Sequence, residues 1–84
     1  ILKNTNELLP EQYIQKKETA SALKQGLASL REKEQLVLSL YYINELNMKE
    51  ISVVMKVSEP RISQIHANAI RKLREYMKRF FEEK

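Results

Sequence analysis

Apolar residues recur at helical spacing in four stretches of the chain. The first stretch predicts a helix over about residues 18–29. Gly26 lies within it and weakens the helix by about 1 kcal/mol relative to alanine. The apolar stripe of this helix consists of Ala22, Leu23, Leu27 and Leu30.

The second stretch predicts a helix over about residues 32–43 that is apolar on most of its sides. Seven of the eight residues from Leu36 to Ile43 are apolar, and Ser39 is the exception. A small domain cannot easily enclose such a helix on every side. We therefore expect the helix either to be buried on most sides or to keep one apolar face for a partner protein.

A third helix is predicted over about residues 48–55. Its stripe consists of Met48, Ile51, Val54 and Met55, at spacings of three and four residues. The pattern stops at Lys56 and Val57, which we interpret as a tight turn. A short helix followed by such a turn and a second helix is the signature of a helix-turn-helix.

The fourth predicted helix begins directly after this turn. Ser58 is a favourable N-cap, Glu59 suits the positive end of the helix dipole, and Pro60 lies in the first turn, where its missing N–H is harmless. The helix extends to about residue 80. Its apolar face consists of Ile62, Ile65, Ala69, Leu73, Met77 and Phe80.

Together these elements predict an all-α fold. We expect a small bundle of about four helices that ends in a helix-turn-helix over about residues 48–76, with a long recognition helix. The domain is predicted over residues 18–80, and residues 81–84 are predicted to be a C-terminal tail. Residues 1–17 are polar with scattered apolar positions, which is typical of an interdomain linker or a short N-terminal helix. One Gly and two Pro are too few turn residues for a strand-rich fold.

The composition excludes several kinds of site. The chain has no cysteine, its eleven acidic residues are all Glu, and His66 is its one histidine. Groups this few rarely converge on one point, so we expect no enzyme activity, no metal and no cofactor. No apolar stretch approaches the ~20 residues that span a bilayer, and we expect a soluble cytoplasmic protein without a membrane partner. Because the chain begins with Ile1, we expect it to be one domain of a longer protein.

The net charge of +4 lies entirely in the C-terminal third. Residues 1–55 hold seven basic groups and seven Glu, whereas residues 56–84 hold eight basic groups and four Glu. Between Arg61 and Arg79 the ratio is six to one, along what is predicted to be one helix. Such a basic stripe is suited to phosphate, although a solvated helix face would show the same charges.

The solvent face of the fourth helix changes character along its length. At its start, Arg61 could pair with a guanine, Gln64 with an adenine, and Glu59 with a cytosine amine, each pair contributing ~1–3 kcal/mol of discrimination. Ser63 lies beside them. The later part of the face carries side chains suited to phosphates, as in helices that read DNA: Asn68, Arg71, Lys72 and Arg74.

His66 and the aromatic residues fall at or near the apolar stripes. His66 lies four residues after Ile62, at the border of the buried face, and we expect it to pack or to contact phosphate without acting as a pH switch. The aromatic residues are expected to anchor the core or an interface. They are Tyr41, Tyr42, Tyr76, Phe80 and Phe81.

The stretch from Leu30 to Arg74 closely resembles a known family. It reads LREKEQLVLSLYYINELNMKEISVVMKVSEPRISQIHANAIRKLR. The strings EKEQLVLSLYY, KEIS, RISQIH and RKLR stand in the order and spacing of region four of the primary-type bacterial sigma factors. Within that family the stretch is most similar to the flagellar, or motility, class.

The resemblance implies a promoter-specificity subunit of RNA polymerase. The last helix would lie in the major groove of double-stranded promoter DNA, at the −35 element. The family's base-contacting positions correspond to Glu59, Arg61, Ser63 and Gln64. Its phosphate-contacting positions correspond to Lys49, Lys56, Asn68, Arg71, Lys72 and Arg74.

The resemblance also implies two protein partners. The family grips the flap-tip helix of the polymerase β subunit with the apolar face of its earlier helices. In the flagellar class, an anti-sigma factor wraps the same domain and keeps it from polymerase. The partner-binding residues would be drawn from Leu27, Leu36, Leu40 and Tyr41.

Two positions depart from the family pattern. Lys56 occupies a turn position that is usually small or left-handed in the family, so a positive φ would strain it. Pro60 replaces a residue that could touch DNA in relatives, but it leaves the helix start intact.

Three alternatives remain at the level of sequence. The effector domain of response-regulator activators shares the LREKE-like start and the KEI helix, but its recognition helix differs from RISQIH. A protein-interaction module with a basic helix would bind an acidic partner and show no DNA sequence preference. A basic amphipathic helix over residues 71–84 could lie on an anionic membrane, which would leave the Ser58 cap without a purpose.

Overall fold

The computed structural model describes residues 18–82, and within this range every element is helical. The all-α prediction is therefore confirmed. The predicted bounds of three helices lie within two residues of those observed, and the last helix runs two residues further, to Glu82. The second predicted helix, over about residues 32–43, is divided into an α-helix and a π-helical segment. The linker predicted over residues 1–17 lies outside the described range. The elements are α3 (Thr19–Ala28), α4 (Glu32–Leu38), a π-helical segment η1 (Ser39–Ile43), α5 (Met48–Met55) and α6 (Glu59–Glu82).

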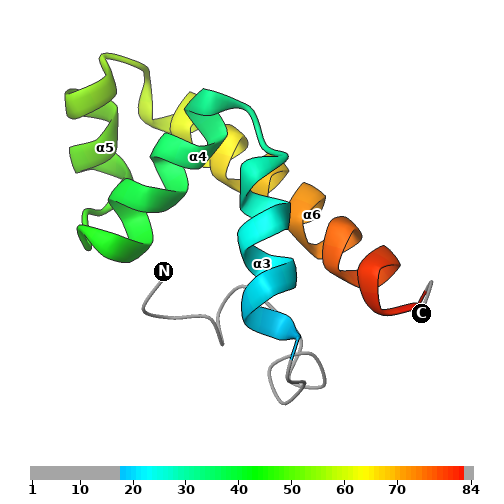
Figure 1. Cartoon of the computed structure of the whole chain (residues 1–84). Helices are drawn as coiled ribbons and strands as arrows, with labels where there is room; N and C mark the ends of the chain where they lie inside the picture. Colours follow the sequence, from blue (N-terminus) through cyan, green and yellow to red (C-terminus); the bar gives the residue numbers. More distant parts are fainter. Residues whose placement is uncertain (1–17, 83–84) are drawn as a thin grey trace.

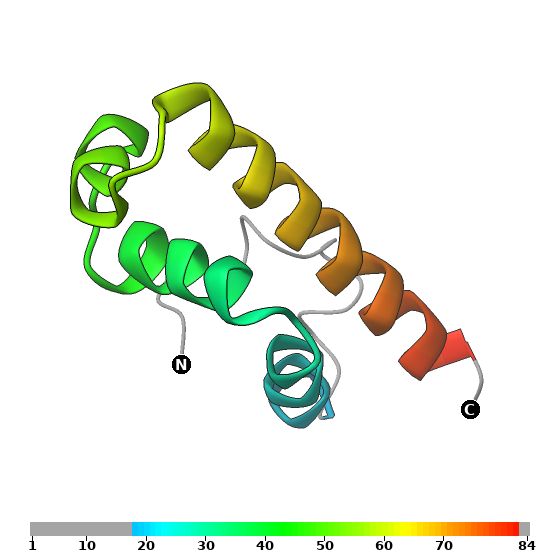
Figure 2. The same cartoon turned by 90° about the horizontal axis from the view of Figure 1, so that it is seen from above.

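The long helix α6 organises the arrangement of the others. Figures 1 and 2 show α5 beside the N-terminal end of α6, α4 beside its middle and α3 beside its C-terminal half. Each of the three shorter helices contacts α6. All three shorter helices therefore pack against α6. The predicted base-contacting residues lie at the N-terminal end of the same helix.

The second predicted helix continues through an irregular segment. The residues of η1 follow α4 without a break. Here the backbone hydrogen bond spans five residues, because the Asn44 N–H donates to the Ser39 carbonyl at 3.1 Å. Glu45 then adopts a φ of 60°, which turns the chain toward α5. Such π-helical turns occur mostly as single insertions in α-helices.

The core consists of two clusters along α6. The first joins α3 and the α4–η1 segment to the middle and C-terminal half of α6, and it includes Leu38, Leu73 and Met77. The second joins α4, α5 and the start of α6 through Val37, Ile51, Ile62 and Ile65. Three members of this second cluster are completely buried. Each buried aliphatic side chain stabilises the fold by ~1.5–3 kcal/mol, so this small cluster sets how α5 meets α6.

One prediction about the core residues was wrong. Val54 was assigned to the apolar stripe of α5 but is 58% exposed, because within residues 18–82 α5 packs against α6 and η1 through the face that carries Ile51. Phe80 is partly buried and packs against the core, as expected for an anchor. Ile70, which the predicted stripe omitted, is buried because α6 contacts three helices along its length and its buried face is correspondingly wide.

Gly26 has a packing role that the sequence did not reveal. A Cβ atom built at this position would lie 2.8 Å from Leu73 Cδ1 and 3.0 Å from Tyr76 Cδ1. Leu73 is completely buried, so it has little room to move. The missing side chain thus lets α3 approach α6 closely, which offsets the lower helix propensity of glycine.

We expect Gly26→Ala to destabilise the domain. Alanine gains about 1 kcal/mol of helix propensity, but overpacking a filled core costs typically 1–3 kcal/mol, so the free energy of unfolding should fall by about 1 kcal/mol. Urea unfolding followed by circular dichroism measures this change. Ser21→Ala is the control, because Ser21 is exposed on the same helix. That variant should gain roughly 0.5 kcal/mol, and a similar gain in Gly26→Ala would refute the packing role.

Candidate nucleic-acid interface

The predicted start of the recognition helix is present in the structure. The Arg61 N–H donates to Ser58 Oγ at 3.3 Å, and the Ile62 N–H donates to the Ser58 carbonyl at 2.9 Å. Ser58 therefore caps α6 as expected, and Glu59 and Pro60 occupy its first turn. The cap fixes the direction in which the first side chains of α6 leave the helix.

The turn before this helix contains Lys56, which the family resemblance marked as strained if its φ is positive. Lys56 ends α5 with φ 58° and ψ 42°, which is the left-handed conformation. The Val57 N–H donates to the Ser52 carbonyl at 3.1 Å and closes the end of the helix. A lysine in this conformation costs roughly 1–2 kcal/mol relative to the right-handed region, so the surrounding packing must hold the turn.

The four predicted base-contacting residues all lie at the surface. Glu59, Arg61, Ser63 and Gln64 are exposed, whereas Ile62 is completely buried and Ile65 nearly so. This alternation points the polar side chains away from the core at the free end of α6. Arg61 and Gln64 also contact each other, because Arg61 Nη1 donates to Gln64 Oε1 at 2.7 Å.

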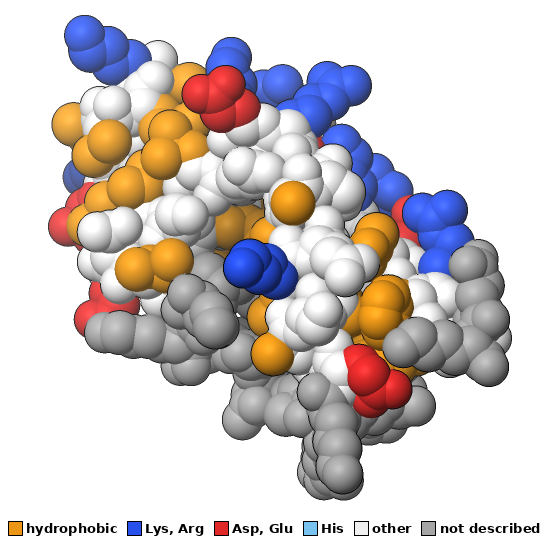
Figure 3. All heavy atoms as spheres, in the orientation of Figure 1, with side chains coloured by type: hydrophobic (Ala, Val, Ile, Leu, Met, Phe, Trp, Pro, Cys, Tyr) orange, Lys and Arg blue, Asp and Glu red, His pale blue; other side chains and the backbone are white. Residues whose placement is uncertain are grey.

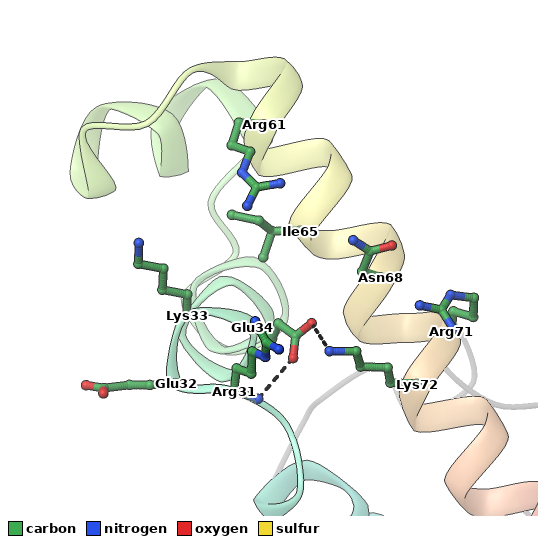
Figure 4. A pocket seen from close by; sticks show the side chains of 9 residues that line it. All are labelled: Arg31, Glu32, Lys33, Glu34, Arg61, Ile65, Asn68, Arg71 and Lys72. Carbon is green, nitrogen blue, oxygen red and sulfur yellow. Dashed lines mark hydrogen bonds and ion pairs between the residues drawn. The ribbon is translucent and has the colours of Figure 1, made fainter.

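A basic cavity of about 650 Å³ opens beside this face, between α6 and the start of α4. Figure 4 shows the side chains of α6 on one side of it and those of α4 on the other. Five of the lining residues are basic and two are acidic. They are Arg31, Glu32, Lys33, Glu34, Arg61, Ile65, Asn68, Arg71 and Lys72.

Arg31 and Lys33 are two members of this cavity that the sequence analysis did not select. Their stretch of chain is neutral overall, because Glu32 and Glu34 alternate with them. Only the packing of α4 against α6 brings the two basic side chains opposite Arg61. The one signal in the sequence is their place at the start of a predicted helix, and that does not show which helix lies opposite.

Glu34 and Lys72 form an ion pair inside the cavity. Lys72 Nζ lies 2.9 Å from Glu34 Oε2, and the Arg31 N–H donates to Glu34 Oε1 at 2.9 Å (Figure 4). Burial raises the pKa of the Glu34 carboxyl, but the hydrogen bonds from Lys72 and from the Arg31 backbone, with the charges of both residues, lower that pKa below its ordinary value overall. Glu34 is therefore ionised at neutral pH, and Lys72 is already partnered within the domain.

The remaining predicted phosphate-contacting residues have different surroundings. Asn68 is half-buried in the cavity wall, and Arg71 is exposed and forms a 3.4 Å ion pair with exposed Glu75. Exposed pairs of this kind contribute little to stability, so Arg71 can exchange Glu75 for a phosphate at small cost. Arg74 lies further along α6, and Lys49 and Lys56 lie on α5 and at its end. These last three residues are exposed.

The four residues predicted to bind protein partners divide into two groups. Leu27 and Tyr41 are half-buried and pack against the core, and Tyr41 touches both clusters. Leu36 is 44% exposed and Leu40 is half-buried. Figure 3 shows hydrophobic side chains gathered over α5 and the adjoining part of α4. The exposed apolar residues also include Ile43 of η1 and Val53 and Val54 of α5.

His66 lies at the border of the buried face, as predicted, and contacts two tyrosines of η1. Its Nε2 atom lies 3.2 Å from the Tyr42 hydroxyl, and its ring stacks on Tyr42 at a centroid distance of 5.7 Å. The Tyr41 ring lies 5.0 Å away. Burial lowers the pKa of His66, so the neutral ring is favoured in the folded domain.

Comparison with known proteins identifies the family. Residues 26–75 match the family described as Sigma-70, region 4. The chain belongs to this family. The resemblance drawn from the sequence strings is thereby confirmed, including its similarity to the flagellar class. Region 4 is a DNA-binding domain of transcription factors and not an enzyme.

Several curated proteins are similar to this sigma region 4 chain. RNA polymerase sigma factor FliA of Salmonella typhimurium is 57% identical over 49 residues, which are 58% of this chain and 20% of that protein. RNA polymerase sigma-D factor of Bacillus subtilis is 38% identical over 82 residues, which are 98% of this chain and 32% of that protein. The chain thus spans a fifth to a third of the length of these two relatives. No solved structure matches it significantly.

Two further properties of the region 4 domain concern the described residues only. In the part of the chain that the structure describes, no helix is both long and apolar enough to cross a bilayer. Across the same 65 positions, 18–82, no three His, Cys, Asp or Glu side chains lie close enough together to hold a metal ion.

We expect the stability of the domain to fall as His66 becomes protonated. The pKa of His66 is lowered in the folded state, so as the pH falls through the ordinary histidine pKa of 6.5 the unfolded state takes up a proton first. The melting temperature should therefore decline between about pH 7.5 and about pH 5. His66→Gln keeps a polar partner for Tyr42 and should flatten this decline. An unchanged decline in the variant would contradict the assignment to His66.

We expect Arg71 and Lys72 to differ in their effect on DNA binding, although they are neighbours. Arg71→Met should make the plot of log affinity against log salt shallower by about 0.9, because one phosphate contact is lost. Lys72→Met should change that slope little. It should instead lower the free energy of unfolding by about 1 kcal/mol, because Glu34 loses its partner in a partly solvated site. Titrations of promoter DNA at several salt concentrations, with urea unfolding of both variants, measure the two effects. Equal slopes for the two variants would contradict this division.

Proposed function

We propose that this domain reads the −35 element of a promoter through the first two turns of α6. The observation that carries the proposal is the exposed start of α6, where Arg61 and Gln64 project outward while Ile62 and Ile65 anchor the helix in the core. Side chains at the N-terminal end of a recognition helix are those that reach base edges in the major groove. Glu59 and Ser63 are proposed as further base contacts.

The basic surface beside this face supports contact with the DNA backbone. Arg71 lies on α6 itself, while Arg31 and Lys33 lie opposite it across the basic cavity. Charges on both sides of the reading residues would position the helix in the groove without reading sequence. We propose Lys49, Lys56, Asn68 and Arg74 as further phosphate contacts, with Lys72 as a lesser one because Glu34 already holds it.

We further propose that the domain works as part of a sigma factor bound to RNA polymerase in the cytoplasm. The exposed apolar residues Leu36 and Ile43, with half-buried Leu40 between them, support docking of the β flap or of an anti-sigma factor. Similarity to proteins named FliA and sigma-D supports a role at flagellar and motility promoters. Membership of the sigma family removes the reason to consider a response-regulator effector domain.

The proposal is tested by two alanine variants on two kinds of DNA. In the full-length protein that contains this chain, reconstituted with RNA polymerase core, Gln64→Ala should cost ~1–3 kcal/mol on the preferred promoter and less on random duplex. Arg71→Ala should weaken binding to both duplexes alike. Competition binding with labelled promoter fragments measures the four values.

Two outcomes would refute the assigned roles. Equal losses for both variants on both duplexes would mean that Gln64 does not read bases. Binding that shows no sequence preference in the unmutated protein would favour the alternative in which the basic helix serves a protein partner only.

A further inference from the structure

Two neighbouring basic residues of α6 have acidic partners in different surroundings. The Arg71–Glu75 pair is 3.4 Å long, and both of its side chains are more than half exposed. The Lys72–Glu34 pair is 2.9 Å long, and the Lys72 side chain is 38% exposed whereas that of Glu34 is 9% exposed. Water and salt therefore screen the first pair, while the second is a short contact to a carboxylate in the wall of the basic cavity.

The Glu34 carboxylate is held at both of its oxygens. Oε2 faces Lys72 Nζ, and Oε1 accepts the backbone N–H of Arg31 at 2.9 Å (Figure 4). The bond to Arg31 belongs to the start of α4, so a backbone donor holds the carboxylate in place independently of Lys72. A DNA phosphate that approached Lys72 would therefore meet a negative charge that is already fixed there.

The two charges of this pair largely cancel for a phosphate outside the domain. Lys72 has three N–H donors and can bond a second acceptor, but the carboxylate 2.9 Å away repels any phosphate that its ammonium attracts. Arg71 lines the same cavity, and its exposed partner Glu75 can move away at small cost. The pairing of Lys72 thus removes one positive charge from those that the cavity offers to DNA.

We propose that Glu34 limits the affinity of the domain for DNA, because its carboxylate takes the place beside Lys72 that a backbone phosphate would otherwise occupy. With this carboxylate present, Lys72 contributes little to binding, and without its charge Lys72 becomes a further phosphate contact. Phosphate contacts carry no sequence information, so Glu34 lowers the affinity for all DNA sequences alike. This inference rests on the DNA contact in the proposed function.

The test is a variant that removes the charge of Glu34 and keeps its shape. Glu34→Gln retains an oxygen that can accept the Arg31 N–H, as glutamine does in capping boxes. The full-length protein that contains this chain, with RNA polymerase core, is titrated with a −35 duplex and with random duplex at several salt concentrations. On both duplexes, the plot of log affinity against log salt should become steeper by about 0.9. The gain in affinity should then grow roughly threefold to fourfold as salt falls from about 200 mM to about 50 mM.

Two further variants show whether Lys72 causes this gain. Glu34→Gln combined with Lys72→Met should return the slope to that of the unmutated protein, because no ammonium remains to bind the additional phosphate. Glu32→Gln is the matched control, since it removes the same charge from an exposed side chain of the same cavity. Its effect on the slope should be much smaller, because solvent already screens that carboxylate.

Three results would overturn the inference. They are an unchanged slope in Glu34→Gln, a gain that persists in the double variant, and an equal gain in Glu32→Gln. Circular dichroism shows whether each variant is folded. If Glu34→Gln does not fold, Lys72→Met alone decides the question: a nearly unchanged slope supports the inference, whereas a loss as large as that of Arg71→Met would show that Lys72 binds phosphate despite Glu34.

The proposed function fails in a different way. If the unmutated protein binds promoter and random duplex equally at every salt concentration, promoter reading is refuted, while the slopes of the variants still decide the role of Glu34. If the protein prefers the promoter but Glu34→Gln does not alter the slope, promoter reading stands and the role of Glu34 is refuted.

Discussion

Burial of Ile62 and Ile65 against Val37 and Ile51 is the interaction on which the interface depends. These four side chains join α4, α5 and the start of α6 in one small cluster. Because Ile62 and Ile65 face inward, the residues between and beside them must face outward at the free end of α6. Neither the Ser58 cap nor the left-handed turn at Lys56 could fix this orientation without the cluster, since each acts on the backbone of a few residues only.

The first cluster, which includes Leu73 and Met77, holds the middle and C-terminal half of α6. Gly26 allows α3 to lie close against this part of α6, so a helix of 24 residues is anchored over its C-terminal half. The domain thus carries its exposed candidate reading residues on a helix that is packed along its length. Sites on rigid helices hold their side chains more reproducibly than sites on loops.

The basic surface of this domain is set by where the charged side chains lie in the fold, and the count of charges along the chain does not show it. A count along the chain assigns the positive charge to the C-terminal third, yet the basic cavity is completed by Arg31 and Lys33 from a neutral stretch. Glu34, from the same stretch, holds Lys72 and reduces the charge that α6 offers to DNA. The adjacent Arg71 pairs with exposed Glu75 and keeps its charge available.

The local pattern of residues determined the helices of this protein, because apolar spacing and capping act over a few neighbouring positions. It therefore predicted the start of α6 at Ser58 and the exposure of Arg61 and Gln64, while the strain at Lys56 was expected from the family resemblance if its φ were positive. Tertiary structure alone decided the exposure of Val54, the need for glycine at position 26 and the basic cavity between α4 and α6. These features depend on which helix packs against which. The spacing of residues along the chain does not show how close two helices lie in the folded domain.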